Sequence, residues 1–273
     1  MLKGEIAMSL QNAAAAQQAF EGALNIVPGD LPAQLAIVQA LLVQEKFEQA
    51  GANLSALIEE YPKHPGLLFL SAQNELTGNR NIEAAEAALT VALNQSPDDT
   101  SALLLMAWVM LMKGDLESAL ENLNAHQVLL PGDPAGSKLL AYVLLRRGEL
   151  LRGIEVLQRA VDKSPGDMEL VTLLGDAYLQ AGEQEKANPL FSRAVGRVAN
   201  NAPIRTQWAT SLLATADTEG ALRELEAAVA VDPDYTRAEF LLARLYYQLG
   251  NYEQTLAWAK RLAEKYPQDP RPY

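Results

Sequence analysis

Histidine is the side chain most often used as a general base or metal ligand near neutral pH, and this chain has two, His64 and His126. They lie 62 residues apart, and neither belongs to a cluster of acidic residues at metal-binding spacing. The chain has no cysteine, which excludes thiolate ligands, disulfides and cysteine nucleophiles. We therefore predict a loop position for His64, a packing role for His126 and no metal site.

Patterns for other kinds of catalysis are missing as well. The sequence contains neither a Gly-x-Ser-x-Gly turn nor a glycine-rich phosphate loop of the Walker type. Acidic pairs such as Glu59-Glu60 and Asp98-Asp99 fall in predicted turns and on helix surfaces, where carboxylates are usually solvated or cap helices. The sequence thus predicts a chain that is not an enzyme and needs no cofactor.

The composition excludes several functional classes. With 22 Lys and Arg against 34 Asp and Glu, the net charge is -12, which argues against a partner made of nucleic acid. Hydrophobic residues make up 49%, enough to bury a core. The longest apolar run, Ala102 to Met112, has eleven residues, whereas a membrane-spanning helix needs about 20. We expect no membrane span and, since no basic segment precedes an apolar one at the start, no signal peptide in this chain.

The elements that must position any functional residue repeat with a period close to 34. Prolines recur at spacings of 34, 35, 34, 34, 68 and 34, and the missing one falls at Ala199. These prolines are Pro28, Pro62, Pro97, Pro131, Pro165, Pro233 and Pro267. Glycines lie midway in most periods, at Gly78, Gly114, Gly148, Gly182 and Gly250. Proline ends a helix and glycine adopts the left-handed conformation after one, so each period predicts a helix, a Gly turn, a second helix and a Pro turn. Asp or Asn residues that follow these prolines should cap the next helix.

Residues 168–201 show how the two helices of one period pack. Leu174 and Tyr178 share one face of the first helix, and Ala187, Phe191 and Ala194 share one face of the second. Small residues recur at the equivalent places in other periods, where two helix backbones must approach closely. The pattern predicts an all-α solenoid of about sixteen helices and no strands.

This 34-residue pattern resembles the tetratricopeptide repeat (TPR) over essentially the whole chain. The resemblance implies a right-handed superhelix of antiparallel helix pairs, read here as a single TPR array over 1–273. The predicted repeats are 1–30 (partial), 31–64, 65–99, 100–133, 134–167, 168–201, 202–235 and 236–269, and 270–273 begin another. Because neither end looks like a polar capping helix, we expect the chain to be a slice of a longer array.

Two repeats depart from the pattern. Repeat 65–99 holds one extra residue, which we place near Asn79 to Ile82. Repeat 168–201 carries Pro189 within its second helix, and proline removes a helical hydrogen bond and clashes with the preceding turn. We expect a local irregularity there, unless the helix starts late enough to place Pro189 in its first turn.

The resemblance implies that the first helix of each repeat lines a concave face, and that a protein or peptide ligand binds there. Reading off the concave positions gives aromatic and basic residues, the types that dominate interface hot spots. The candidate partner-binding residues are Phe69, Trp108, Lys138, Tyr142, Arg146, Arg237, Phe240, Arg244 and Tyr247. Two alternatives stay open: the central aromatics simply pack neighbouring first helices, or the patch from Arg237 to Tyr247 docks a further repeat.

More specific expectations come from particular residues and short sequence segments within the repeats. The concave positions, Gln39, Gln73 and Thr210 among them, lack the Lys and Asn set of the chaperone-tail clamp of TPR cochaperones. Phrases such as Leu2 to Ala7 and Leu173 to Leu179 resemble the bacterial TPR lipoproteins of exosortase/PEP-CTERM exopolysaccharide systems. That implies a non-catalytic scaffold in the periplasm or attached to the outer membrane. The alternatives are a cytoplasmic peptide-binding adaptor, or a TPR segment of a larger enzyme or of an outer-membrane export porin.

The ends of a truncated array should tend to associate with other protein surfaces. We expect the last repeat to expose apolar residues that a neighbouring repeat would bury, including Leu256, Leu262 and Tyr266. End-to-end self-association of the truncated array is the predicted consequence.

Overall fold

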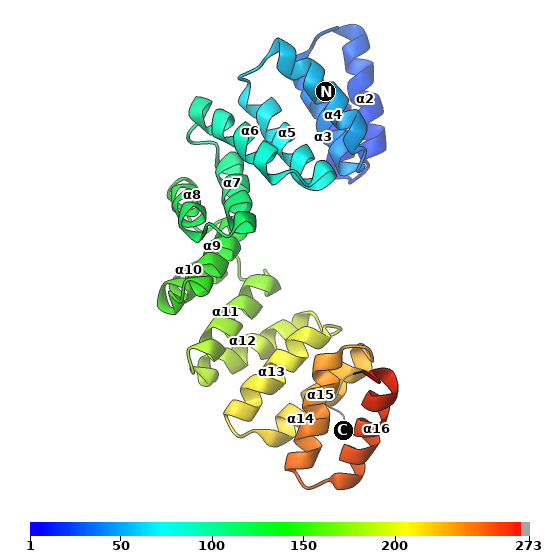
Figure 1. The fold of residues 1–273 in the computed structure, drawn as a ribbon, viewed down its shortest axis with the longest axis vertical. Helices are drawn as coiled ribbons and strands as arrows, with labels where there is room; N and C mark the ends of the chain where they lie inside the picture. The colour runs from blue at the N-terminus through cyan, green and yellow to red at the C-terminus, as the bar shows by residue number, and fades with distance from the viewer. Residues whose placement is uncertain (269–273) are drawn as a thin grey trace. The chain divides into compact units, whose positions relative to one another are not determined.

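The computed structural model describes residues 1–268, and within them the chain forms sixteen α-helices, one π-helical turn and no strand (Figure 1). The start of a further repeat predicted at 270–273 lies outside the described residues. The all-α prediction is confirmed. The chain divides into two compact units, Met1–Pro131 (unit 1) and Gly132–Tyr273 (unit 2), which are described separately below. None of the helices within 1–268 is long and apolar enough to cross a membrane.

The helices of both units have similar lengths apart from the short α1. Unit 1 contains α1 (Leu2–Ser9), α2 (Ala13–Ile26), α3 (Leu31–Val43), α4 (Phe47–Glu60), α5 (Pro65–Asn74), the π-turn η1 (Glu75–Asn79), α6 (Ile82–Gln95), α7 (Thr100–Lys113) and α8 (Leu116–Leu129). Unit 2 contains α9 (Pro134–Arg146), α10 (Leu150–Lys163), α11 (Met168–Gln180), α12 (Gln184–Arg197), α13 (Ala202–Ala214), α14 (Thr218–Val231), α15 (Thr236–Gln248) and α16 (Tyr252–Lys265).

Helices pack in sequential pairs. Each odd-numbered helix, called a first helix below, packs against the even-numbered second helix that follows it, and that second helix contacts the next first helix within the unit. In unit 2 the first helices α9, α11, α13 and α15 also contact one another in order, and in unit 1 α3 contacts α5. The first helices therefore form the inner layer of each stack, which is the arrangement of the predicted solenoid.

Most of the polar turns cap the following helix as predicted, but Asp30 makes no capping hydrogen bond to α3 and Asp234 does not cap α15, so the prediction is wrong at these two turns. The side chains of Asp99, Asp133, Asp167 and Asn201 each accept a hydrogen bond from the backbone N–H of the helix that follows. His64 lies in the turn before α5, where its Nδ1 accepts from the Leu67 N–H at 3.4 Å. The predicted loop position of His64 is therefore confirmed, and the imidazole takes the place of a capping carboxylate.

Four of the five glycine turns have the predicted left-handed geometry, with φ between +72° and +80° after α7, α9, α11 and α15. Gly78 does not, and that prediction is wrong. It lies inside the π-turn Glu75–Asn79, and Arg80 adopts the left-handed conformation instead, with φ at +53°. A π-turn holds one more residue than an α-turn, so it absorbs the extra residue of this repeat, slightly before the predicted place.

Pro189 does not interrupt helix α12, although an irregularity was expected there. Helix α12 runs unbroken from Gln184 to Arg197 with Pro189 as its sixth residue, too far inside for a first-turn position. Pro189 and Glu185 are both exposed. Water can therefore bind the Glu185 carbonyl that a proline leaves without a helical partner.

Large and small side chains interlock at the core. Phe191 is fully buried, and a Cβ built on Gly175 would lie 3.0 Å from its ring. Phe20 fills the equivalent space beside Gly4 in unit 1. His126 is buried in unit 1, with its Nδ1 3.0 Å from the Thr100 carbonyl oxygen, which confirms the predicted packing role.

Candidate functional site

In unit 1 the inner layer carries an apolar hollow of about 630 Å³. Its walls come from the first helices α1, α3 and α5, together with a residue of α2. The lining residues are Met1, Glu5, Met8, Phe20, Pro32, Leu35, Ala36, Gln39, Gly66, Phe69 and Leu70. Phe69 thus lies where the sequence places it, but it is half-buried and also packs against the core of unit 1.

Trp108 differs from Phe69 in its exposure. It lies in the middle of α7 between the buried residues Ala107 and Val109, yet 48% of it is exposed. A tryptophan left this open by its neighbours retains about half of its surface for contact with a partner. Of the two interpretations of the central aromatics, packing describes part of Phe69, whereas Trp108 is available for contact.

In unit 2, Tyr142 and Arg146 form one exposed pair on α9. Arg146 Nη1 donates to the Tyr142 hydroxyl at 2.9 Å, and the guanidinium carbon lies 5.8 Å from the ring centroid. Tyr142 is 46% exposed. The pair presents an ordered aromatic ring and a cation side by side, which suits a ligand with both apolar and polar groups.

Lys138, also on α9, has a different role. Its Nζ lies 3.0 Å from Asp167 Oδ2 and also pairs with Glu169, so it links α9 to the start of α11. Asp167 in turn caps α11. Lys138 is therefore held by intramolecular ion pairs and is less available to a ligand than Arg146.

Asp176, on the inner side of α11, is a carboxylate that the residue pattern does not single out as a candidate. Its Oδ2 accepts a hydrogen bond of 2.7 Å from Gln207 Nε2 on α13, the next first helix. Burial raises the pKa of Asp176 to about 6, and the positive field of Arg237 on α15 opposes that shift. The only hint in the sequence is an acidic residue at the position that carries Tyr142 one repeat earlier.

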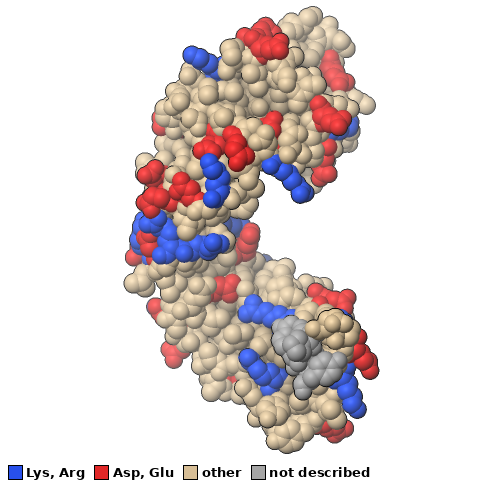
Figure 2. Space-filling view, in the orientation of Figure 1, with Lys and Arg blue, Asp and Glu red and all other residues tan. Residues whose placement is uncertain are grey.

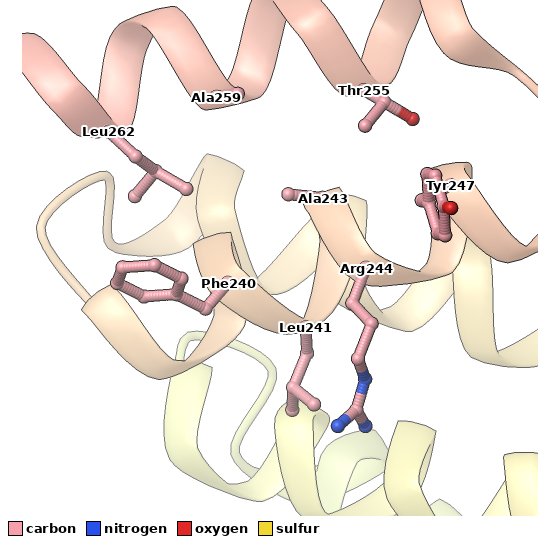
Figure 3. Close-up of a pocket in the computed structure, with 8 residues that line it drawn as sticks. All are labelled: Phe240, Leu241, Ala243, Arg244, Tyr247, Thr255, Ala259 and Leu262. Carbon is pink, nitrogen blue, oxygen red and sulfur yellow. The ribbon is translucent and has the colours of Figure 1, made fainter. Parts of the chain in front are cut away.

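The last helix pair encloses a groove of about 430 Å³ between α15 and α16 (Figure 3). Phe240, Ala243 and Tyr247 face Thr255, Ala259 and Leu262 across it, whereas Arg244 extends away from α16 toward the preceding helices. The sequence predicts that Phe240, Arg244 and Tyr247 form one patch. In the structure Phe240 and Tyr247 face α16, whereas Arg244 points toward the preceding helices. Arg237 is exposed at the start of α15.

One repeat earlier the same positions are covered. The residues 34 places before five of the lining residues are the buried Thr206, Ala209, Ala221, Leu225 and Ala228. There α15 packs on α13 and α14. The α15/α16 groove therefore has the form of a seat for another first helix. Within this face Leu262 is buried and Tyr266 is half-buried, with its hydroxyl 2.6 Å from Thr236 Oγ1, so the prediction that Leu262 is exposed is wrong.

The charged residues of the described chain do not assemble into a metal site, since within 1–268 no three His, Asp or Glu side chains lie close enough to hold an ion. On the face shown in Figure 2, Lys and Arg side chains lie in small groups interspersed with Asp and Glu. What the inner layers offer is a contact surface of aromatic, basic and amide side chains.

Two family models, both described as tetratricopeptide repeat, match the chain, one at residues 76–142 and 212–273 and the other at 138–202. The chain belongs to the tetratricopeptide repeat family. The stacked helix pairs are thus TPR units, and the fold is the right-handed TPR solenoid predicted from the sequence. No match was found among curated proteins.

Solved structures with this fold are distant in sequence. A chain of the APC/C hetero-tetramer Cut9-Hcn1 is similar at a TM-score of 0.65 and 14% identity, over 99% of this chain and 53% of that one. This TPR chain therefore spans about half the length of that relative. PilF of Pseudomonas aeruginosa has a TM-score of 0.64 at 16% identity, over 76% of this chain and 94% of its own. YrrB, described as a TPR protein with an unusual peptide-binding site, has a TM-score of 0.59 at 20% identity, over 68% and 95%. At these identities the likeness establishes the fold alone.

Proposed function

We propose that this TPR protein is a non-catalytic scaffold that binds a protein or peptide segment on its first helices. The observation that carries the proposal is the exposure of Trp108 and of the Tyr142–Arg146 pair on the inner layers of the two units. Large aromatic and arginine side chains dominate the energetics of protein interfaces. The description of YrrB as a peptide-binding TPR protein supports the same use of the fold.

The first test is to replace the exposed aromatics. We expect Trp108→Ala to weaken peptides that bind unit 1, and Tyr142→Ala to weaken peptides that bind unit 2, each by at least about fivefold, because an anchoring aromatic contributes more than about 1 kcal/mol. The peptides are selected on this protein from a random phage-displayed library. Isothermal titration calorimetry measures the change. Leu151→Ala is the matched control, since Leu151 is 71% exposed but lies on the second helix α10. Unchanged affinity in both aromatic variants contradicts the proposal.

The cellular role that we propose is in the bacterial envelope, in exopolysaccharide production or PEP-CTERM protein sorting or export, with the protein periplasmic or attached to the outer membrane. The phrases Leu2 to Ala7 and Leu173 to Leu179 support it. Fractionation of cells that express the native gene tests the location. Recovery in the cytoplasmic fraction would favour a peptide-binding adaptor, and fusion of the array to a catalytic domain or to an outer-membrane barrel would favour a segment of an enzyme or export porin.

A second proposal concerns the α15/α16 groove, which we infer seats a helix from a second copy of the chain. Support comes from the burial of the equivalent residues one repeat earlier and from Tyr247, which lines the groove and is 62% exposed. Leu256 does not line the groove, but it lies on α16 next to the lining residue Thr255 and is 56% exposed. Burying apolar surface contributes about 25 cal/mol per Å², so such a face favours association.

Sedimentation of the 1–273 chain over a range of concentrations measures this association. We expect the double variant Tyr247→Ser, Leu256→Ser to weaken self-association at least about tenfold, since two exposed apolar contacts are lost. Leu151→Ser removes an equally exposed residue from another helix and should change nothing. A strictly monomeric wild-type chain at millimolar concentration would refute the proposal, and association unaffected by the double variant would place the interface elsewhere.

A further inference from the structure

Asp176 lacks the structural duties that other acidic residues of this array perform. Asp99, Asp133 and Asp167 each cap a helix, whereas Asp176 lies in the interior of α11. Glu239, which is fully buried on α15, has Lys265 Nζ at 3.2 Å and Arg261 Nε at 3.4 Å. Within residues 1–268, Asp176 has no such cation in salt-bridge contact, and its hydrogen-bond partner is the neutral Gln207 amide.

The position is costly for the fold. A partly buried carboxylate loses hydration that a single amide hydrogen bond does not replace, and its raised pKa reflects that loss. Arg237 acts on Asp176 through its field from α15 without an ion pair. Because an ionised carboxylate can accept several hydrogen bonds, Gln207 orients Asp176 and leaves acceptor capacity unused.

The location relates this carboxylate to the binding face. Asp176 occupies on α11 the position that Tyr142 occupies on α9, 34 residues earlier, and the two first helices contact each other. Equivalent positions on adjacent first helices are neighbours on the inner layer. An aromatic ring next to a partly desolvated carboxylate suits a long cationic side chain, whose stem packs on the ring while its charge meets the carboxylate.

We propose that Asp176, oriented by Gln207, is the subsite for a lysine or arginine side chain of the peptide that binds unit 2. This inference rests on the proposed peptide-binding function and adds the chemistry of the ligand. It predicts that the ligand has a positively charged side chain at one fixed position. The arginines Arg146, Arg237 and Arg244 by themselves would instead favour acidic ligands.

The probe is the set of 12-residue peptides selected on the whole chain from a random phage-displayed library. We expect the selected peptides to share a lysine or arginine at one position. Replacing that residue by norleucine should raise the Kd at least tenfold, and so should Asp176→Asn in the protein. When both changes are combined the loss should be no greater than either alone, because both remove the same contact.

Asp162→Asn is the matched control. It removes the same charge from a protein of net charge -12, but Asp162 is exposed on the second helix α10, where it accepts a hydrogen bond from Gln158. A Kd within twofold of wild type is expected for this variant. An equal loss in Asp162→Asn and Asp176→Asn would mean that general charge attraction, and not a subsite, binds the peptide.

The two levels of proposal fail differently. If selected peptides bind and depend on Tyr142 but carry no fixed cation, or if Asp176→Asn leaves their affinity unchanged, the cation subsite is wrong and the peptide-binding function stands. If no peptide is selected, or if those selected bind independently of Trp108, Tyr142 and Asp176, both proposals are wrong.

Discussion

Replacing Phe191 by alanine is expected to lower the free energy of unfolding of unit 2 by about 3–5 kcal/mol, the cost of a large cavity in a packed core. The ring is fully buried between α11 and α12 and lies against Gly175, which has no side chain to fill the space. Urea denaturation followed by circular dichroism measures the change. Hydrogen exchange of the α11 and α12 amides locates it, because repeat arrays unfold locally as well as globally.

Tyr142→Ala is the control for loss of an aromatic ring, since Tyr142 is about half exposed on the same unit. Its cost should stay below about 1 kcal/mol, as for most surface substitutions. A loss of under 1 kcal/mol for Phe191→Ala would show that α12 does not pack on α11 as described.

Asp176→Asn is expected to stabilise the free protein at pH 8 by about 1–3 kcal/mol. Burial raises the folded-state pKa of Asp176 to about 6 from its ordinary value of 3.8, so the folded state binds a proton more tightly than the unfolded chain. Stability is therefore lost as pH rises from about 4 to about 6 and stays low above that window. Asparagine carries no charge and can keep a hydrogen bond to Gln207, so it removes this loss.

Thermal denaturation of both proteins between pH 4 and pH 8 checks the sign. The gain from Asp176→Asn should be largely lost near pH 4, where the folded-state carboxyl group is protonated and the unfolded-state one is about half protonated. Asp162→Asn should show no comparable dependence. A variant that is less stable than wild type at pH 8 would mean that the ionised Asp176 already has a stabilising partner in the free protein. Stabilisation together with loss of peptide affinity is the pattern that a residue kept for binding should give.

Much of this architecture follows from short-range signals. The proline period, the capping Asp99, Asp133, Asp167 and Asn201, and the glycines after α7, α9, α11 and α15 act within a few residues of themselves. Caps and left-handed turns depend on local backbone conformation, which is why the sequence predicts helix number and helix ends well. The packing of Leu174 with Phe191 was also predictable, because helical periodicity places these residues on facing sides of one repeat.

Local signals fail where two outcomes have similar local energies. The one extra residue in repeat 65–99 could either lengthen a turn or enter a helix. In the structure it enters the π-turn, where Gly78 packs so closely on Phe47 that a Cβ built on Gly78 would lie 2.6 Å from the Phe47 Cβ. Pro189 can break a helix, but its exposed position lets solvent take the freed carbonyl, so the packing of Ala187 and Phe191 keeps α12 continuous.

The properties that bear on function depended on tertiary structure. From the sequence, Lys138 is predicted to be a cation that faces the ligand. In the folded protein it instead forms ion pairs with Asp167 and Glu169. From the sequence, Phe240 and Tyr247 are predicted to lie beside Arg244 in the binding groove. The side of α15 from which their side chains contact a neighbour depends on the position of α16. Asp176 and Gln207 are 31 residues apart on different helices, and the desolvation that raises the Asp176 pKa exists only once α11 and α13 are packed together. Sequence periodicity determined which face of each helix looks inward. Only the packed repeats decided which inward side chains are already satisfied by neighbours and which, like Asp176, still have capacity for a partner.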